Sequence, residues 1–349
     1  MKMMRAVVVE RPLVFSVKQV PVPATPRDGL LVKVLACGLC GSDLRTLRSG
    51  HKNITFPWTL GHEICGTIEE IGDACTSPWH VGDRLAIGPL AYCGTCEFCT
   101  SGRHELCENQ KELGQHWPGG LAEYVAIPAE CVKLGNIQLV PEGMKDTHAA
   151  VIEPISSCVH AQEKARVSLG DTVVVFGAGP IGCIHVALAK ARGAFRVYLI
   201  DIDGNRLAMA DAFNPDGTIN SAVQDPVEAV RKLTGGKGAE VIIVATPAPI
   251  AAVQAVEMAK KGGRIVQFGG LPHHDSKPGI DMNLVHYRGL TIIGTSTFNP
   301  RHNRTAMQLV QTGLVPADKL ITHVFSLDDF EEGANLALVG KVLKGVYVP

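Results

Sequence analysis

The sequence has almost no net charge and few aromatic residues. Its 33 Lys and Arg residues nearly balance 34 Asp and Glu residues, so the formal net charge is −1. A chain this neutral presents no overall basic field, which argues against DNA or RNA as a partner. Only 5% of its 349 residues are aromatic, whereas Gly (37) and Pro (21) are frequent. We therefore expect many turns and a core of small aliphatic side chains.

Long hydrophobic runs and an export signal are also missing. The longest charge-free stretches, residues 172–189 and 241–256, are interrupted by Gly, Pro and polar residues. Such stretches are poor membrane spans. The apolar run at the N-terminus ends at Glu10 and Arg11, without the pattern of a signal peptide. These absences predict a cytoplasmic protein that does not bind a membrane.

The chain length suggests about two domains, and the residue pattern changes near residue 150. Before that point, short apolar runs separated by Gly, Pro and Asp predict strands at residues 5–9, 30–36, 122–127 and 131–134. Beyond it, β-branched runs predict buried strands at residues 172–176, 196–200, 241–244 and 264–268. Helical spacing lies between them at residues 181–191 and 250–260. This alternation predicts an α/β fold with a doubly wound parallel sheet at about 155–295.

The tail does not extend this alternation. Residues 303–312 and 327–339 have helical spacing, and residues 345–348 form a short apolar run that predicts a strand.

A glycine-rich turn follows the first buried strand and opens a helix. It reads Gly177-Ala-Gly179-Pro180-Ile181-Gly182 and has the G-x-G-x-x-G spacing of a dinucleotide site. The helix N-terminus supplies free N–H groups for phosphates. Asp201 ends the next strand, where a carboxylate can bind both ribose hydroxyls and repel a 2′-phosphate, which favours NAD over NADP. Two alternatives stay open: Arg206 could help to bind a 2′-phosphate, or Asp201 could only cap a helix.

Cysteine is abundant, with 11 residues, and four of these lie within fifteen positions. An odd number without an export signal makes a disulfide scaffold the weaker interpretation. Cys93, Cys96, Cys99 and Cys107 have the spacing of a closed four-thiolate zinc site, which is a structural arrangement. An iron–sulfur cluster is the main competitor, but seven residues separate the last two cysteines, unlike the ferredoxin pattern. A zinc-ribbon binding module without catalysis is a remote alternative.

Three further motifs are weak singly and specific in combination. They are Cys40-Gly-Ser42-Asp43, Gly61-His62-Glu63 and Glu153-Pro154. Together with the four-cysteine lobe, the glycine-rich turn and Ile321-Thr-His323, they make an ordered set that covers nearly the whole chain. In this set the chain resembles the zinc-dependent medium-chain alcohol dehydrogenases, and within them the sorbitol (polyol) and threonine dehydrogenase branch.

The resemblance implies a fold and a set of roles. It implies a GroES-like, mostly β catalytic domain (1–154) with a zinc lobe at about 88–110, a Rossmann NAD-binding domain (155–295) and a C-terminal segment (296–349) that returns to the first domain. It implies a catalytic zinc bound by Cys40, His62 and Glu63, with Glu153 beside it as a direct ligand or through water. Ser42 would pass on the alcohol proton.

The sequence departs from the family at the next member of the proton relay. Where several branches have a histidine, this chain has Arg45, whose pKa is above ~12 and which cannot accept a proton. His51 is a candidate substitute, although a loop histidine is the simpler interpretation.

The implied activity is oxidation of a secondary alcohol of a polyol-like substrate to a ketone, with two zinc ions per chain and NAD as the hydride acceptor. The alternative substrates are a phosphorylated sugar alcohol, threonine and an amino-cyclitol. An alternative reaction is that of an isomerase or lyase, in which the hydride returns to the same substrate.

Two clusters of basic residues could bind an anionic group of the substrate, although a solvated face is the simpler interpretation. The clusters are Arg45, Arg48 and Lys52, and Arg301 and Arg304. The resemblance also implies a homo-oligomer, a tetramer, for which residues 290–293 and 346–348 suit pairing at a sheet edge.

Overall fold

The computed structural model describes residues 2–76 and 78–349 of the chain. These residues form two compact units. Unit 1 contains the chain up to Ser156 together with Phe298–Thr312 and Ile321–Pro349, and unit 2 contains Ser157–Thr297 and Gly313–Leu320. The chain passes from unit 1 to unit 2 within α5 (Ile152–Lys164). Of the expected C-terminal segment, 296–349, most residues belong to unit 1, and Gly313–Leu320 belong to unit 2. The short helix α12 (Ala317–Leu320) contacts α6 (Pro180–Ala191) of unit 2, and its residues Ala317 and Leu320 are buried.

Unit 1 is mostly β. Its strands are β1 (Met3–Arg11), β2 (Val14–Pro21), β3 (Leu30–Gly38), β4 (Glu63–Ile71), β5 (Arg84–Ile87), β6 (Leu90–Ala91), β7 (Lys111–Glu112), β8 (Tyr124–Ile127), β9 (Ile137–Leu139), β16 (His323–Ser326) and β17 (Gly345–Val348). Its helices are α1 (Gly41–Ser49), α2 (Glu97–Thr100), α3 (Ala129–Lys133), α4 (Asp146–Ala150), α11 (Pro300–Gln311) and α13 (Phe330–Leu338), with 3-10 turns at His104–Leu106 and Leu327–Asp329.

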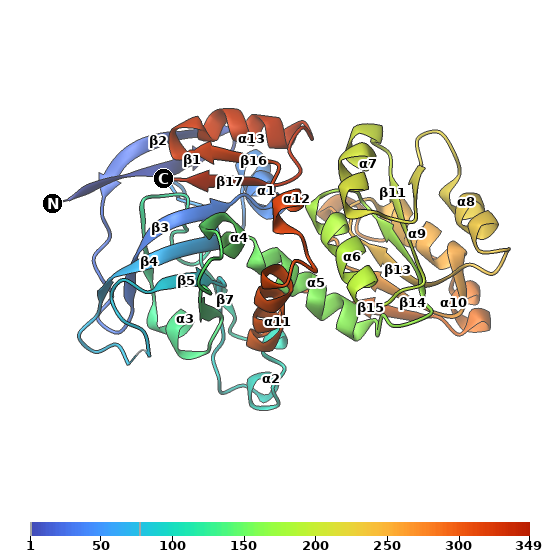
Figure 1. The fold of residues 1–349 in the computed structure, drawn as a ribbon, viewed down its shortest axis with the longest axis horizontal. Helices are drawn as coiled ribbons and strands as arrows, with labels where there is room; N and C mark the ends of the chain where they lie inside the picture. Colours follow the sequence, from blue (N-terminus) through green and yellow to red (C-terminus); the bar gives the residue numbers. More distant parts are fainter. Residues whose placement is uncertain (1, 77) are drawn as a thin grey trace. The chain divides into compact units, whose positions relative to one another are not determined.

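One sheet of unit 1 joins the two ends of the chain. Its strand order is β16-β17-β3-β4-β5-β9, with β8 also paired to β3. Figure 1 shows the C-terminal strand β17, in red, beside the blue strand β3. In this register Gly38 at the end of β3 lies opposite Glu63 at the start of β4 and Val346 in β17. The ends of three strands therefore meet at one place.

Unit 2 is a six-stranded parallel sheet with the order β12-β11-β10-β13-β14-β15. Its strands are β10 (Thr172–Phe176), β11 (Arg196–Asp201), β12 (Gly217–Asn220), β13 (Ala239–Val244), β14 (Ala259–Gln267) and β15 (Thr291–Gly294). Besides α6 and α12, its helices are α7 (Gly204–Ala210), α8 (Pro226–Leu233), α9 (Pro249–Met258) and α10 (Met282–Arg288), with 3-10 turns at Asp211–Phe213 and His273–Asp275. The strand order reverses direction at β10, so right-handed crossovers put α6 and α9 on opposite faces. This confirms the predicted doubly wound sheet.

Three sequence predictions need correction. Residues 131–134 are not a strand, because Pro128 caps the short helix α3 there; a four-residue apolar run does not distinguish the two structures. The helix predicted at 327–339 begins as a 3-10 turn, and α13 starts only at Phe330. The last strand, β17, lies between β16 and β3, so its backbone is already paired and is not a free sheet edge.

No helix among the residues described is long and apolar enough to cross a membrane. The buried side chains are predominantly Val, Ile, Leu and Ala, which agrees with the expected aliphatic core.

Candidate metal centres and dinucleotide turn

The meeting point of β3, β4 and α1 brings together three of the predicted ligands. Cys40 is the residue before α1, and His62 and Glu63 lie where β4 begins. One potential ligand atom from each of these three residues lies within 4.8 Å of the others. His62 and Glu63 are buried, with 5% and 0% of their surfaces exposed, and Cys40 is half-buried. A thiolate, an imidazole and a carboxylate are a donor set that suits zinc.

Asp43, which we did not single out as a site residue, orders two members of this group. Its carboxylate accepts a hydrogen bond from the Cys40 backbone N–H at 3.0 Å and lies 3.3 Å from Nδ1 of His62. A carboxylate on Nδ1 leaves Nε2 as the metal-binding nitrogen. Burial opposes a charge on the His62 ring, but Asp43 and Cys40 nevertheless raise the pKa of His62 well above its ordinary value. The signal was in the motif itself, since Asp43 is its last residue.

Glu63 has a second buried partner, Lys344, whose position just before β17 the sequence did not indicate. Lys344 is 2% exposed; its Nζ donates to Glu63 Oε1 at 2.5 Å and to the carbonyl of Leu39 at 3.1 Å. The Glu63 carboxylate also fills the space over Gly38, where a Cβ would lie 2.0 Å from Oε2. This ion pair neutralises a carboxylate that would otherwise be costly to bury.

Two other predicted residues lie near this group without belonging to its ligand set. Ser42 Oγ is 3.5 Å from Nε2 of His62, the nitrogen that faces the group. Glu153, in α5, is half-buried and is not one of the three ligand residues. Burial, together with the charges of Glu63 and Glu112, raises the pKa of Glu153 to about 8, although His62 opposes this.

The remaining candidates on α1 and α11 are exposed. Arg45, Arg48, Lys52, Arg301 and Arg304 all lie at the surface, which agrees with a solvated face. His51 is half-buried and accepts a hydrogen bond from the Asn53 backbone at 3.3 Å. Burial and the neighbouring charges of Lys52, His116 and Arg45 lower the pKa of His51.

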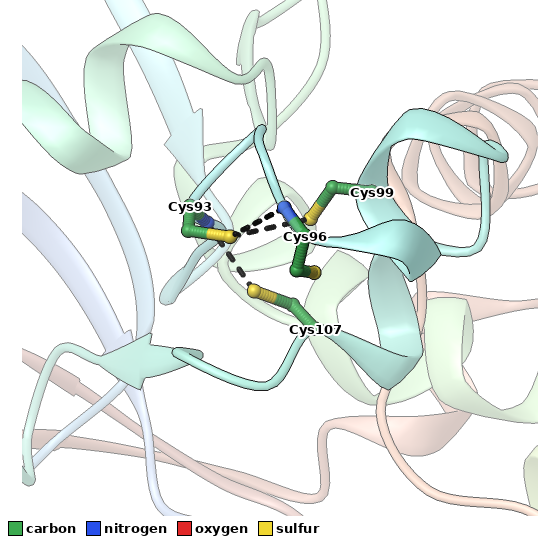
Figure 2. A group of neighbouring side chains, drawn as sticks. All are labelled: Cys93, Cys96, Cys99 and Cys107. Atoms are coloured by element: carbon green, nitrogen blue, oxygen red, sulfur yellow. Dashed lines mark hydrogen bonds between the residues drawn. The ribbon is translucent and has the colours of Figure 1, made fainter.

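The four cysteines of the lobe converge on a single point (Figure 2). The sulfur atoms of Cys93, Cys96, Cys99 and Cys107 lie within 4.8 Å of one another. Backbone N–H groups also point at these sulfurs, from Cys96 to Cys93 at 3.3 Å and from Cys93 to Cys107 at 3.2 Å. All 11 cysteines of the chain are free thiols. The group therefore has the geometry of a closed four-thiolate site.

The lobe itself stabilises negative charge on two of the sulfurs. Hydrogen bonds from the backbone N–H groups of Thr95 and Cys96 lower the pKa of Cys93 to about 5. Those of Cys99 and Glu108 lower the pKa of Cys96. Burial raises the pKa of Cys99 to about 12 and also raises that of Cys107. Only thiolates bind zinc well. The lowered pKa values of Cys93 and Cys96, the two less buried cysteines of the lobe, therefore favour metal binding.

The glycine-rich turn has the shape that a dinucleotide needs. Gly177 has φ +99°, and a Cβ on Gly182 would lie 1.7 Å from the Gly177 carbonyl. Gly179 has open space around its Cα, and Pro180 and Ile181 begin α6. Because these glycines carry no side chains, a pyrophosphate can approach the backbone of the turn closely.

Asp201 and Asp203 have different structural roles. Asp201 Oδ2 accepts a hydrogen bond from the Ala178 N–H of the turn at 2.6 Å, and its Oδ1 accepts from the Asp203 N–H at 2.9 Å. Asp203 caps α7, with its side chain accepting from Asn205 and Arg206 backbone N–H groups. The helix-capping role considered for Asp201 therefore belongs to Asp203. Each Asp201 oxygen keeps a lone pair for a ribose hydroxyl.

Comparison with known proteins gives a consistent result. Residues 26–136 match the family described as alcohol dehydrogenase GroES-like domain, and residues 180–312 match the family described as zinc-binding dehydrogenase. The chain is 33% identical to an L-threonine 3-dehydrogenase of Bacillus velezensis over 96% of this chain and 95% of that one. It is 32% identical to a sorbitol dehydrogenase of Halalkalibacterium halodurans over 96% of each chain.

A solved structure agrees over the full length. A zinc-binding dehydrogenase from Sinorhizobium meliloti, bound to NADP, superposes with a TM-score of 0.90 at 32% identity and covers 100% of both chains. A binding module without catalysis does not fit these matches, because both families are dehydrogenases.

Proposed function

The chain belongs to the zinc-dependent medium-chain alcohol dehydrogenase family, and on that premise we propose that it oxidises a secondary alcohol of a polyol-like substrate to a ketone, with NAD as hydride acceptor. The observation that carries the proposal is the group of Cys40, His62 and Glu63, whose potential ligand atoms lie within 4.8 Å of one another. A zinc with three protein ligands keeps a position for a substrate oxygen. Threonine, an amino-cyclitol and a phosphorylated sugar alcohol stay as alternative substrates.

Cys40, His62 and Glu63 hold the catalytic zinc in this proposal. When bound, the metal supplies Lewis-acid polarisation of the substrate oxygen. The carboxylate of Asp43 orients His62, and Lys344 fixes the Glu63 carboxylate. Glu63 is the glutamate in the ligand group, which favours it over Glu153 as the resting ligand. Glu153 then acts beside the metal, where its raised pKa suits a group that carries a proton.

Cys93, Cys96, Cys99 and Cys107 hold the second, structural zinc. Four sulfurs leave no open position for a substrate, so this ion stabilises the lobe and takes no part in the reaction.

Ser42 is the first acceptor of the alcohol proton. Its hydroxyl lies 3.5 Å from Nε2 of His62, the nitrogen that would bind the metal. Arg45 is exposed and permanently charged, so the proton leaves Ser42 by another route. Among the residues described, no direct hydrogen bond joins Ser42 to His51, and water is the remaining carrier.

The glycine-rich turn and Asp201 bind the cofactor. Gly177, Gly179 and Gly182 leave the backbone bare for the pyrophosphate, and Pro180 and Ile181 open the helix whose N–H groups face it. Asp201 binds the ribose and disfavours a 2′-phosphate. In this proposal Arg206, in the first turn of α7, moderates the preference because its positive charge would attract a 2′-phosphate.

We also propose a cytoplasmic homotetramer. The support is the family and one exposed edge: β15 ends the parallel sheet of unit 2, and Ile292 on it is 44% exposed. Unpaired edges of this kind are suited to pairing with a second copy.

A panel of alcohols assayed by NADH absorbance tests the function. We expect NADH to accumulate with at least one polyol-like secondary alcohol. An isomerase or lyase would instead convert its substrate without free NADH, and lack of turnover on every alcohol of the panel would contradict the proposal.

A further inference from the structure

Glu112 carries a carboxylate that has no part in the proposed metal or cofactor sites. It lies in the two-residue strand β7, half-buried, about fifty residues from His62 in the sequence. Within the residues described, no Lys, Arg or His side chain forms an ion pair with it. A half-buried carboxylate without a cation is costly unless something donates hydrogen bonds to it.

The backbone places Glu112 beside the candidate catalytic group. The chain from Gly114 to Leu121 is hydrogen-bonded along residues 58–61, which lead directly into His62. Trp58 Nε1 donates to the Gly114 carbonyl at 2.9 Å, and Gly120 N–H donates to the Gly61 carbonyl at 2.8 Å. Glu112 is close enough that the charges of His62 and Asp43 act on it.

The Glu112 side chain has one satisfied oxygen and one available oxygen. Gln115 Nε2 donates to Oε2 at 2.9 Å, which fixes the carboxylate. In the described part of the chain, no donor is bonded to Oε1. Burial raises the pKa of Glu112, and its carboxyl also acts on that of Glu153.

The other acidic side chains near the group, Asp43 and Glu63, already have partners. Asp43 holds Cys40 and His62, and Glu63 is paired with Lys344. Among the residues described, neither Glu112 nor Glu153 forms an ion pair with Lys, Arg or His. Their carboxyl oxygens can accept hydrogen bonds from a substrate, and they supply no positive charge for a phosphate or carboxylate.

We propose that Glu112, held by Gln115, is a specificity-determining residue that accepts a hydrogen bond from a second donor of the alcohol substrate, a hydroxyl or an ammonium group beside the reacting carbon. This inference rests on the proposed function. It selects polyols and amino alcohols from the substrates left open and disfavours phosphorylated sugar alcohols. A site built to bind a polar group rejects analogues that lack it, because its own polar atoms are then left unpaired.

The test compares substrates with and without the second donor: sorbitol, L-threonine, sorbitol 6-phosphate and 2-butanol. In Glu112→Leu, the ratio of kcat/KM for the preferred donor-bearing substrate to that for 2-butanol should fall at least roughly tenfold, mainly through KM, since a hydrogen bond to a charged group is lost. Glu142→Gln, at an exposed carboxylate of unit 1, is the control and should leave the ratio unchanged.

Glu112→Gln distinguishes a hydroxyl donor from an ammonium donor. It also provides a second variant in case Glu112→Leu does not fold. A hydroxyl is still bound by the amide, so the ratio should fall less than about fivefold for a polyol. An ammonium group loses its charge partner, so the ratio for L-threonine should fall as far as in Glu112→Leu. Zinc content and the substrate-induced shift in Tm give readouts of the site and of binding that do not depend on turnover.

Two results would overturn the proposal. One is an equal fall in kcat/KM for 2-butanol and the donor-bearing substrates in both variants; the other is no change in the ratio in either variant. Preference of the wild type for sorbitol 6-phosphate would contradict it as well. If the wild type oxidises none of the four alcohols while it holds both zinc ions, the proposed function itself fails, and the specificity role fails with it.

Discussion

The two candidate metal centres of unit 1 are built in opposite ways. The four-cysteine lobe takes all its ligands from residues 93–107, and its own backbone N–H groups stabilise the sulfurs. The Cys40–His62–Glu63 group takes its ligands from the ends of different elements and depends on Asp43 and Lys344, the latter 281 residues from Glu63. One centre is local; the other exists only when the whole β unit is folded.

This difference fits the structural and catalytic roles that we propose for the two centres. A local loop of four thiolates closes around a metal and leaves nothing for a substrate. A centre assembled from three strand ends can keep an open position, because its ligands are held from outside by buried charges. Substitutions in each centre test this contrast between a structural and a catalytic metal site.

The largest effect is expected at His62. His62→Ala should lower kcat by more than about 10³-fold, equivalent to about 4 kcal/mol, because a metal ligand is lost. The zinc of the lobe should remain, so that metal content falls from two ions to one. His80→Ala, at a histidine whose side chain is 88% exposed, is the matched control. Normal turnover by His62→Ala would end the assignment of the catalytic centre.

Cys96→Ser should lower the stability of the fold and leave turnover nearly unchanged. Loss of one thiolate opens the lobe, and the free energy of unfolding should fall by several kcal/mol, on the scale of a structural zinc. Thermal unfolding would show this, while kcat of the folded fraction stays within about threefold. Cys75→Ser is the control, since Cys75 is outside both centres. Two results together would contradict the structural role of the lobe and the catalytic role of the other centre. They are an unchanged Tm in Cys96→Ser and an unchanged kcat in Glu153→Ala.

The dependence of the catalytic centre on remote charge is tested at Lys344. In the zinc-free protein, Lys344→Met leaves the Glu63 carboxylate buried without a partner, which costs about 3–5 kcal/mol. Urea unfolding of the chelator-treated protein measures this cost. Lys341→Met, at an exposed lysine, should change nothing. Equal stabilities of the two variants would mean that the ion pair does not hold the site.

The smallest effect lies outside both centres. Asp201→Ala should reduce the preference for NAD over NADP by roughly tenfold, about 1.4 kcal/mol, and leave two zinc ions in place. Asp203→Ala should instead weaken α7 by about 1 kcal/mol and leave the cofactor ratio unchanged. The ratio of kcat/KM for the two cofactors decides between them, and a change at Asp203 alone would transfer the ribose contact to that residue.

The same contrast determines how much the sequence alone could predict. The four-cysteine lobe follows from spacing, and the parallel sheet follows from β-branched runs separated by helical spacing, because both are local patterns. Cys40, His62 and Glu63 emerged only through a family resemblance, since no local rule joins residues on different strands. Lys344 and Glu112 carried no signal, because their meaning depends on the pairing of β17 with β3 and on the hydrogen bonds of residues 114–121. Residues 131–134 do not form the predicted strand, because a run so short fits either a strand or a helical turn.

Metal analysis of the purified wild type, His62→Ala and Cys96→Ser shows whether the chain holds one structural and one catalytic zinc. We expect two zinc ions per chain in the wild type and one in each of His62→Ala and Cys96→Ser, with turnover lost only in the first of these variants. One zinc ion in the fully loaded wild type, or iron in the four-cysteine lobe, would contradict it.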